Sequence, residues 1–501
     1  MIFWRVKSLD SIMATAEKKS LERSLGVWQL TLLGVGAIIG TGIFVLTAEA
    51  AQKAGPGMMI AFVIAGFVCA VAALCYSELS SMVPVSGSAY TYSYAVLGEL
   101  IAWMVGWALI LEYSVAAGAV AVGWSGYLVG LLDNSSLGIE IPFALANGPY
   151  AGGIINLPAV IICILVVGLL IIGTRESATF NALLVAVKIT ALTAFAALAL
   201  PVSNLDHFQP FLPLGTSGVV AAAASIFFAY VGFDAVSTAA EETKDPQRNL
   251  PIALVGSLLI CTIFYLLISV GVVGATGAQP LMNAAGEGLM PGSKEMAEQC
   301  QLLAAEGYQP VVCSQEALAH VLREIGWVKV GNMIGLAAFL ALPSVVLMML
   351  FGQTRIFFVM SRDGLLPEGL SKIHPRFKTP YVVTLVTGVV VTLAAAFLPV
   401  GKLANISNSG TLFAFLVVAL SVMILRVKDK NRHRPFKAPI IWLVGPLAIG
   451  GCITLFMFLP LDAQLVFPIW TCIGLVFYYL YGYRKSHVLS GVDLPQQKQS
   501  D

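Results

Sequence analysis

Three ionisable side chains stand inside long apolar stretches of this sequence. Glu112 lies in "WALILEYSVAA", Lys188 in "LLVAVKITALTAF" and Asp234 in "FFAYVGFDAV". A charge at the centre of a bilayer costs about 2.5–3.5 kcal/mol on the insertion scale, so each residue needs a reason to be there. A lysine that is desolvated in a helix bundle holds its proton less tightly. We therefore expect these residues to carry protons; the alternative is a static ion pair of Lys188 with Glu112 or Asp234.

A second feature is the placement of glycine in two apolar stretches. "GVGAIIGTGIF", from Gly34 to Phe44, holds four glycines in nine residues, and each costs up to about 1 kcal/mol in a helix relative to alanine. The sixth apolar stretch carries Gly232 two residues before Asp234. Interrupted helices at corresponding positions of two halves are typical of the binding sites of membrane transporters.

Bare peptide groups at two such interruptions suit a zwitterion. The half-helix that starts near Thr41 and Gly42 offers free N–H groups and a positive dipole end to a carboxylate. The carbonyls near Ile38 and from Phe228 to Val231 suit an ammonium group. We therefore predict an α-amino acid site. The alternative is that small residues only allow close helix packing.

Composition indicates the elements that must hold these groups. The chain has 501 residues, of which 58% are hydrophobic and 11% are charged, against roughly 25% charged residues in soluble proteins. Repeated apolar runs of about 20 residues predict an all-α polytopic membrane protein. We expect twelve spans, at about 27–48, 57–80, 97–131, 157–174, 177–200, 216–241, 251–276, 329–360, 379–399, 404–426, 438–460 and 464–483.

The positions of Lys and Arg indicate the orientation. If the N-terminus is cytoplasmic, the cytoplasmic segments carry 22 of the 28 Lys and Arg residues, the opposite side carries five, and Lys188 lies within a span. This bias follows the positive-inside rule. We therefore expect a multi-pass protein of the cell inner (plasma) membrane with both termini in the cytoplasm.

Five spans separate the two interrupted helices, and an odd offset reverses topology. We therefore expect two inverted repeats, followed by two added helices. The loop within the second repeat is acidic, and "EALAHVLREIGW" predicts a short amphipathic helix there. The expected organisation is a cytoplasmic segment at 1–26, repeats at 27–200 and 216–426, an extracytoplasmic loop at 277–328, helices at 438–483 and a cytoplasmic tail at 484–501.

The eight cysteines show no CxxC spacing. Six fall in apolar spans and are interpreted as small buried hydrophobes. Cys300 and Cys313 share the acidic loop, where an oxidising compartment would allow a disulfide; two free thiols are an equal alternative.

Several function classes are excluded. All five histidines fall in predicted loops, so no buried zinc site, HExxH pattern or Ser–His pair is expected at membrane depth. Only Asp234 qualifies for an intramembrane aspartyl protease, which needs two aspartates, and no Walker A motif is present. The net charge of +1 gives no reason to expect a nucleic-acid partner. We expect no enzyme activity, no cofactor and no bound metal.

Five stretches together resemble the amino acid–polyamine–organocation superfamily, in particular bacterial members of its cationic amino acid transporter family. The resemblance covers about Leu21 to Tyr483. It is carried by "GVGAIIGTGIF", "AGPGMMIAFVIAG", "CYSELSSMVPVSGSAYTYSY", "FFAYVGFDAVSTAAEETKDPQRNLPIAL" and "GQTRIFFVMSRDGLLP". It implies a LeuT-like fold of five plus five inverted helices and a permease that works by proton-coupled symport and alternating access.

The resemblance also implies roles for individual residues. Thr41 and Gly42 match the substrate-carboxylate position, and Phe228 matches an aromatic gate. Lys188 matches a lysine that replaces a sodium ion in sodium-coupled relatives. Glu112 matches an acid that family members share. The amino group is expected at the carbonyls of Ile38, Phe228, Ala229 and Val231.

Side-chain specificity is expected to depend on the eighth span, near Leu342, Pro343 and Ser344. Similar proteins that accept arginine tend to have a small polar residue where this chain has Pro343, and no acid stands beside it. An unpaired guanidinium is costly to bury. We therefore expect small or medium neutral L-amino acids such as alanine as substrates.

Other readings stay open at this point. They are a cationic amino acid or polyamine carrier, an exchanger of two amino acids, and an amino acid sensor that transports nothing. The expected partners are the amino acid, a proton and membrane lipid; a small single-span subunit is left open.

Overall fold

The structure is a computed structural model that describes residues 25–85, 87–135, 138–173, 178–377 and 379–487, together with Val6 and Arg23. Most of the expected N-terminal segment and of the C-terminal tail lies outside the described residues, as does Arg175. Within the described part the chain is helical, and β-structure is limited to the isolated bridges Leu25↔Thr243 and Met282↔Gly288. The prediction of an all-α membrane protein is confirmed.

Each of the twelve predicted spans contains an apolar helix. In the described residues, seven helices are long and apolar enough to cross a membrane, and five shorter apolar helices accompany them. In chain order the principal helices are α2 (Val27–Ile38), α5 (Met58–Met82), α7 (Glu99–Asp133), α9 (Leu157–Ile172), α10 (Ala178–Ala199), α11 (Gly215–Ile226), α13 (Pro246–Thr276), α16 (Val328–Arg362), α17 (Tyr381–Phe397), α18 (Val400–Lys428), α19 (Ile441–Met457) and α20 (Leu461–Phe477).

Shorter helices connect or complete these spans. They are α3 (Thr41–Phe44), α4 (Leu46–Ala54), α6 (Ser88–Val96), α8 (Phe143–Ala146), α12 (Ala235–Thr238), α14 (Lys294–Ala305), α15 (Ala317–Glu324) and α21 (Tyr483–Lys485), with the single turns η1 (Gly55–Gly57), η2 (Pro149–Ala151), η3 (Leu200–Val202), η4 (Leu205–Phe208), η5 (Phe227–Tyr230), η6 (Ala240–Glu242), η7 (Val311–Cys313), η8 (Glu368–Ser371) and η9 (Tyr478–Gly482).

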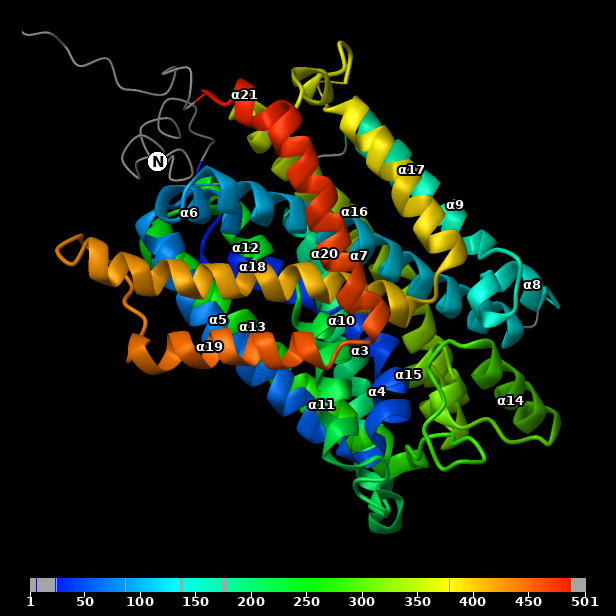
Figure 1. The fold of residues 1–501 in the computed structure, drawn as a ribbon. Helices are drawn as coiled ribbons and strands as arrows, with labels where there is room; N and C mark the ends of the chain where they lie inside the picture. Colours follow the sequence, from blue (N-terminus) through cyan, green and yellow to red (C-terminus); the bar gives the residue numbers. More distant parts are fainter. Residues whose placement is uncertain are drawn as a thin grey trace, which may run out of the picture.

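The helices form a bundle around the two interrupted spans. α7 and α16, each 35 residues long, pack against each other, and α18 packs against α7 on another side. α9 and α17 lie side by side at one edge of the molecule (Figure 1). This arrangement places the interrupted spans between α7, α13 and α16, away from that edge.

Both glycine-containing spans are interrupted where the sequence predicts it. α2 ends at Ile38, Ile39 and Gly40 leave the helical conformation, and α3 begins at Thr41. In the sixth span α11 continues into η5, Val231 is extended, and the chain becomes helical again at Ala235. The extended residues interrupt the hydrogen-bond ladder of each helix, so peptide groups become available near its middle.

The loop at 277–328, which the sequence predicts to be extracytoplasmic, is folded onto the bundle. Cys300 and Cys313 form a disulfide with a Cα–Cα distance of 5.7 Å, and the predicted amphipathic helix is α15. The prediction that all six span cysteines are buried is wrong for Cys472, which is exposed. The reason is that α20 covers the outside of the bundle and buries only Ala463 and Gly474 of its residues.

Candidate substrate-binding site

The two interruptions touch each other through glycines. A Cβ atom placed on Gly42 would lie 2.2 Å from the Cα atom of Ala229, so only glycine lets these backbones approach this closely. On the other side, Gly232 has φ +118° and faces Ala37 in α2. The positive φ favours glycine independently of the space around it. The close crossing therefore explains why glycine stands at both interruptions.

The amides at the start of α3 belong to buried residues. The first N–H groups of a helix have no acceptor within that helix, and those of α3 belong to Thr41, Gly42 and Ile43. The Thr41 hydroxyl is buried and has no hydrogen-bond partner among the described residues. Gly123 in α7 leaves room for the Thr41 side chain. Donors without acceptors at a positive helix end suit a carboxylate.

Two carbonyls from the two interruptions converge on one hydroxyl. The buried Tyr265 hydroxyl in α13 lies 2.9 Å from the Ile38 carbonyl oxygen and 2.7 Å from that of Ala229. A hydroxyl has one proton and cannot donate fully to both oxygens at once. The second lone pair of each carbonyl stays available to a further donor such as an ammonium group. The Phe228 carbonyl accepts from the Val231 amide at 3.2 Å.

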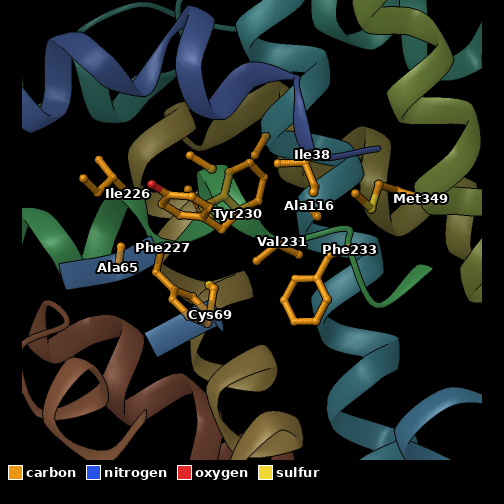
Figure 2. Close-up of a cluster of buried hydrophobic side chains, with 14 of the residues drawn as sticks. Ile38, Ala65, Cys69, Ala116, Ile226, Phe227, Tyr230, Val231, Phe233 and Met349 are labelled. Atoms are coloured by element: carbon orange, nitrogen blue, oxygen red, sulfur yellow. The ribbon is translucent and has the colours of Figure 1, made fainter. Parts of the chain in front are cut away.

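Apolar side chains surround these peptide groups. Ile38, Ala116 of α7, Val231 and Met349 of α16 belong to one cluster of buried hydrophobic side chains (Figure 2). From α16, Val345 faces Gly40, with 3.5 Å between its methyl carbon and a Cβ built there. The surroundings of the interruptions are therefore aliphatic on the α7 and α16 sides.

Pro343 is predicted from the sequence to line this pocket, and that assignment stays a prediction. Pro343 is half-buried, whereas Leu342 and Val345 are buried. Tyr265, Val345 and Ala116 were missed. Tyr265 carried a signal, because a tyrosine in an apolar span needs a partner for its hydroxyl. Ala116 and Val345 carried no such signal in the sequence, because alanine and valine are common in any membrane span.

Lys188 reaches the helix just before the first interruption. Its Nζ donates to the Gly36 carbonyl oxygen at 2.8 Å, and its side chain is 1% exposed. Gly36 packs against Val185 on the same face of α10. The ammonium group therefore acts on α2 two residues before that helix ends at Ile38.

Two acidic residues within the spans, Glu112 and Asp234, lie near each other. The Tyr113 hydroxyl donates to Asp234 Oδ2 at 3.0 Å, and Glu112 is close enough to Asp234 to act on it electrostatically. Glu112 is fully buried, and neither of its carboxylate oxygens has a hydrogen-bond partner among the described residues. Burying a polar group without a hydrogen bond is costly, which makes this carboxyl an unusual feature of α7.

Contacts close both ends of the interrupted helices. On the side of α6, Leu25 pairs with Thr243, and Arg355 forms an ion pair with Glu242 at 3.3 Å. These contacts tie α2, α16 and the end of the sixth span together. The Arg355–Glu242 pair is partly exposed, so it contributes little to stability.

On the other side a polar network joins α4, α11 and α18. The Ser225 hydroxyl donates to Asn405 Oδ1 at 2.7 Å, and Lys53 donates to Glu49 at 2.8 Å and to Ser225. A cavity of about 330 Å³ lies outside this network, between Glu49 and the disulfide-bonded loop. The central peptide groups are therefore shielded at both ends.

Taken together, the chain is a polytopic helical membrane protein whose two interrupted helices meet at mid-bundle, where Gly42 touches Ala229 and two backbone carbonyls converge on the Tyr265 hydroxyl. This arrangement defines a carrier of small polar molecules rather than an enzyme, and known proteins agree with it. The model of the amino acid permease family matches residues 25–478. The chain belongs to this family of transporters, within the amino acid–polyamine–organocation superfamily.

Individual relatives cover nearly the whole chain. It is 44% identical over 488 residues to the branched-chain amino acid permease BcaP of Bacillus subtilis (strain 168), with 96% of this chain and 98% of that protein covered. It is 39% identical to the methylthioribose transporter of the same organism, with the same coverage of both chains. It is 35% identical to the vacuolar cationic amino acid transporter 2 of Arabidopsis thaliana, with 84% of this chain and 62% of that protein covered.

Proposed function

We propose that this protein imports small or medium neutral L-amino acids together with protons, by alternating access, with both termini in the cytoplasm. The observation that carries the proposal is the convergence of the Ile38 and Ala229 carbonyls on a single donor. Beside it stand the free amides that begin at Thr41. The ammonium group of the substrate binds the carbonyls, and its carboxylate binds the amides.

The aliphatic surroundings of the interruptions favour a neutral side chain. Ala116, Val345 and Met349 offer no charge to a guanidinium or an ammonium, and burying either group unpaired is costly. The relative named as a branched-chain amino acid permease supports the same direction. We therefore assign substrates from alanine to leucine to this site.

Lys188 couples the proton to the movement of α2. Its bond to the Gly36 carbonyl is strong while the amine is charged and weaker when it is neutral. Proton loss from Lys188 therefore releases the inner half of the first span, and proton binding fixes it again. Glu112 and Asp234, which lie near each other, take part in the same proton exchange.

Purified protein in liposomes tests this proposal. With a pH gradient, acidic outside, labelled leucine and alanine accumulate; without a gradient, only counterflow against internal unlabelled amino acid is seen. Excess neutral amino acids compete with the label, and arginine and putrescine do not. Counterflow without gradient-driven uptake would indicate an exchanger, and binding without counterflow would indicate a sensor. Competition by arginine or methylthioribose stronger than by leucine would overturn the substrate assignment.

A further inference from the structure

The short helix α6 is unusually rich in buried hydroxyl groups. It reads "SAYTYSYAV", and all nine residues are buried between α7, α12 and α18. The helix joins the second and third spans on the side predicted to be cytoplasmic. The binding site described above does not use it. Six of its nine residues carry a hydroxyl: Ser88, Tyr90, Thr91, Tyr92, Ser93 and Tyr94.

Some of these hydroxyls are satisfied within the protein. Tyr94 donates to Glu99 at 2.9 Å, Tyr90 donates to Asp363 at 2.8 Å, and Ser93 donates to a backbone carbonyl of its own helix. Such bonds fasten α6 to the ends of α7 and α16. These hydrogen bonds give three of the six hydroxyl groups of α6 a structural role.

Three neighbouring hydroxyls are different. The oxygens of Ser88, Tyr92 and Tyr76 in α5 are buried and have no hydrogen-bond partner among the residues that the structure describes. Leaving a buried polar group unsatisfied costs about 1–3 kcal/mol. Protein interiors avoid this cost by placing ordered water beside such groups. Three hydroxyls of this kind in one place therefore indicate a hydrated region.

This region adjoins the second interruption. The Tyr76 ring packs edge-on against Tyr92 and Phe233, with ring centroids 6.3 Å and 5.8 Å apart. The Ser237 hydroxyl donates to the Asp234 carbonyl at 2.6 Å and neighbours the Tyr92 hydroxyl. The hydroxyls therefore extend from Asp234 towards the side predicted to be cytoplasmic.

Glu112 and Asp234 lie at the end of this region that is deepest in the bundle. Glu112 and Asp234 both act electrostatically on Tyr76, whose hydroxyl neighbours that of Ser88. Glu112 itself faces Asp234 from the sixth span and Thr411 from α18. Each hydroxyl and each water molecule can accept one proton while donating another, which is the property that proton conduction requires.

We propose that Tyr76, Ser88 and Tyr92 order a short chain of water molecules that leads protons from Glu112 and Asp234 to the cytoplasm. The proposal rests on the proposed proton coupling. The O–H bond of the protonated carboxyl breaks, its proton joins the nearest water, and a proton leaves the last water for the cytoplasm. The carboxylate left behind is protonated again from the outer side in the next cycle.

Tyr→Phe variants test the proposal, because they remove the hydroxyl and keep the ring. In liposomes, Tyr76→Phe and Tyr92→Phe lower gradient-driven leucine uptake by about tenfold, as expected for loss of one step of proton transfer. Counterflow needs no net proton movement and stays within about twofold of wild type, because the packed rings remain. The matched control is Tyr94→Phe on the same helix, whose hydroxyl is bound to Glu99 and which leaves both rates unchanged.

The outcomes separate this proposal from the function on which it rests. If leucine uptake by the wild-type protein is the same with and without the pH gradient, the proposal of proton coupling is itself wrong. If wild type responds to the gradient and the Tyr76→Phe and Tyr92→Phe variants do so equally well, only the water chain is wrong. If counterflow falls as much as gradient-driven uptake in these variants, the water chain is also wrong, because the two hydroxyls would then have a packing or gating role. Thermal unfolding verifies folding; the two variants should match wild type because no protein hydrogen bond is lost.

Discussion

Gly42 and Ala229 are in direct backbone contact, although 187 positions separate them in the chain. A Cβ atom on Gly42 would lie 2.2 Å from the Cα of Ala229 and 2.5 Å from its Cβ. Backbone atoms cannot move aside as the end of a flexible side chain can. This contact fixes the distance between the two interrupted helices and therefore the size of the space in which a substrate is held.

Gly42→Ala should therefore weaken amino acid binding. Separating the two helices misplaces donors and acceptors at a cost of about 1–3 kcal/mol, which is roughly a 5- to 150-fold higher Kd. Gly118→Ala in α7 is the matched control, since its Cβ would meet its neighbours only at 3.7 Å or more, an ordinary contact. Calorimetric titration with leucine measures both variants. Equal affinities in Gly42→Ala and Gly118→Ala would contradict the role of the contact.

Lys188→Ala should abolish gradient-driven accumulation and leave part of the substrate binding. The variant loses the charged donor to the Gly36 carbonyl but none of the peptide groups at the interruptions. Uptake of labelled leucine with and without a pH gradient, together with a thermal-shift titration, measures the two properties separately. Undiminished uphill uptake in the variant would refute proton carriage by Lys188.

Tyr265→Phe should raise the KM for leucine about tenfold, which corresponds to the loss of roughly one hydrogen bond between neutral groups. Without the hydroxyl, the Ile38 and Ala229 carbonyls are no longer held at one point. Tyr230→Phe is the control, because its ring packs on Tyr265 while its hydroxyl donates to the Phe62 carbonyl. A KM that rises equally in both variants would point to general packing instead.

Val345→Ala should shift the substrate preference towards larger side chains. Removing two methyl groups beside Gly40 leaves room for a bulkier substrate and weakens the contact with alanine. The competition panel of neutral amino acids then shows phenylalanine gaining on alanine by roughly five- to tenfold. Val346→Ala is the neighbouring control, since Val346 is equally buried in α16 but is not among the nearest neighbours of Gly40. An unchanged ranking would remove Val345 from the pocket.

Arg323→Met should destabilise the protein in a pH-dependent way. Burial raises the pKa of Glu316, and the Arg323 guanidinium, which donates to both of its oxygens, lowers that pKa. Without Arg323 the carboxylate is buried unpaired, at a cost of up to about 3 kcal/mol. When the pKa of Glu316 is higher in the folded than in the unfolded state, the native state is most stable at low pH. Its stability falls once the pH exceeds the pKa of Glu316 in the unfolded state.

The loss of thermal stability in Arg323→Met should therefore grow between pH 5 and pH 8, since about pH 4.3 is the unfolded-state value for glutamate. The double variant Glu316→Gln/Arg323→Met removes both charges and should recover most of the stability at pH 8. A single variant whose loss is the same at both pH values would contradict the ion-pair interpretation.

Much of this architecture could be predicted from local patterns. Apolar runs of span length placed all twelve helices, because the bilayer sets their length and polarity. The glycines of "GVGAIIGTGIF" and Gly232 indicated both interruptions, because glycine is a poor helix former and permits close backbone approach. Lys188, Glu112 and Asp234 were conspicuous because charge is rare in an apolar span.

The assignments that failed or were missed depend on which faces meet. Cys472 looked like any span cysteine, but α20 has few neighbours and leaves it exposed. Cys300 and Cys313 gave no preference for a disulfide until the loop brought their Cα atoms within 5.7 Å. Tyr265, distant in sequence from both interruptions, showed no connection to either.

The sequence by itself therefore determined that this chain crosses a membrane many times, where its helices break and which ionisable residues lie within its spans. Those properties follow from the local chemistry of each segment. Only the tertiary structure decided that Tyr265 joins Ile38 to Ala229, that Lys188 contacts Gly36, and that Tyr76, with Tyr92 packed against its ring, lies near the acidic pair. Contacts of that kind depend on the rotation and crossing of helices far apart in the chain, which periodicity within one helix does not specify.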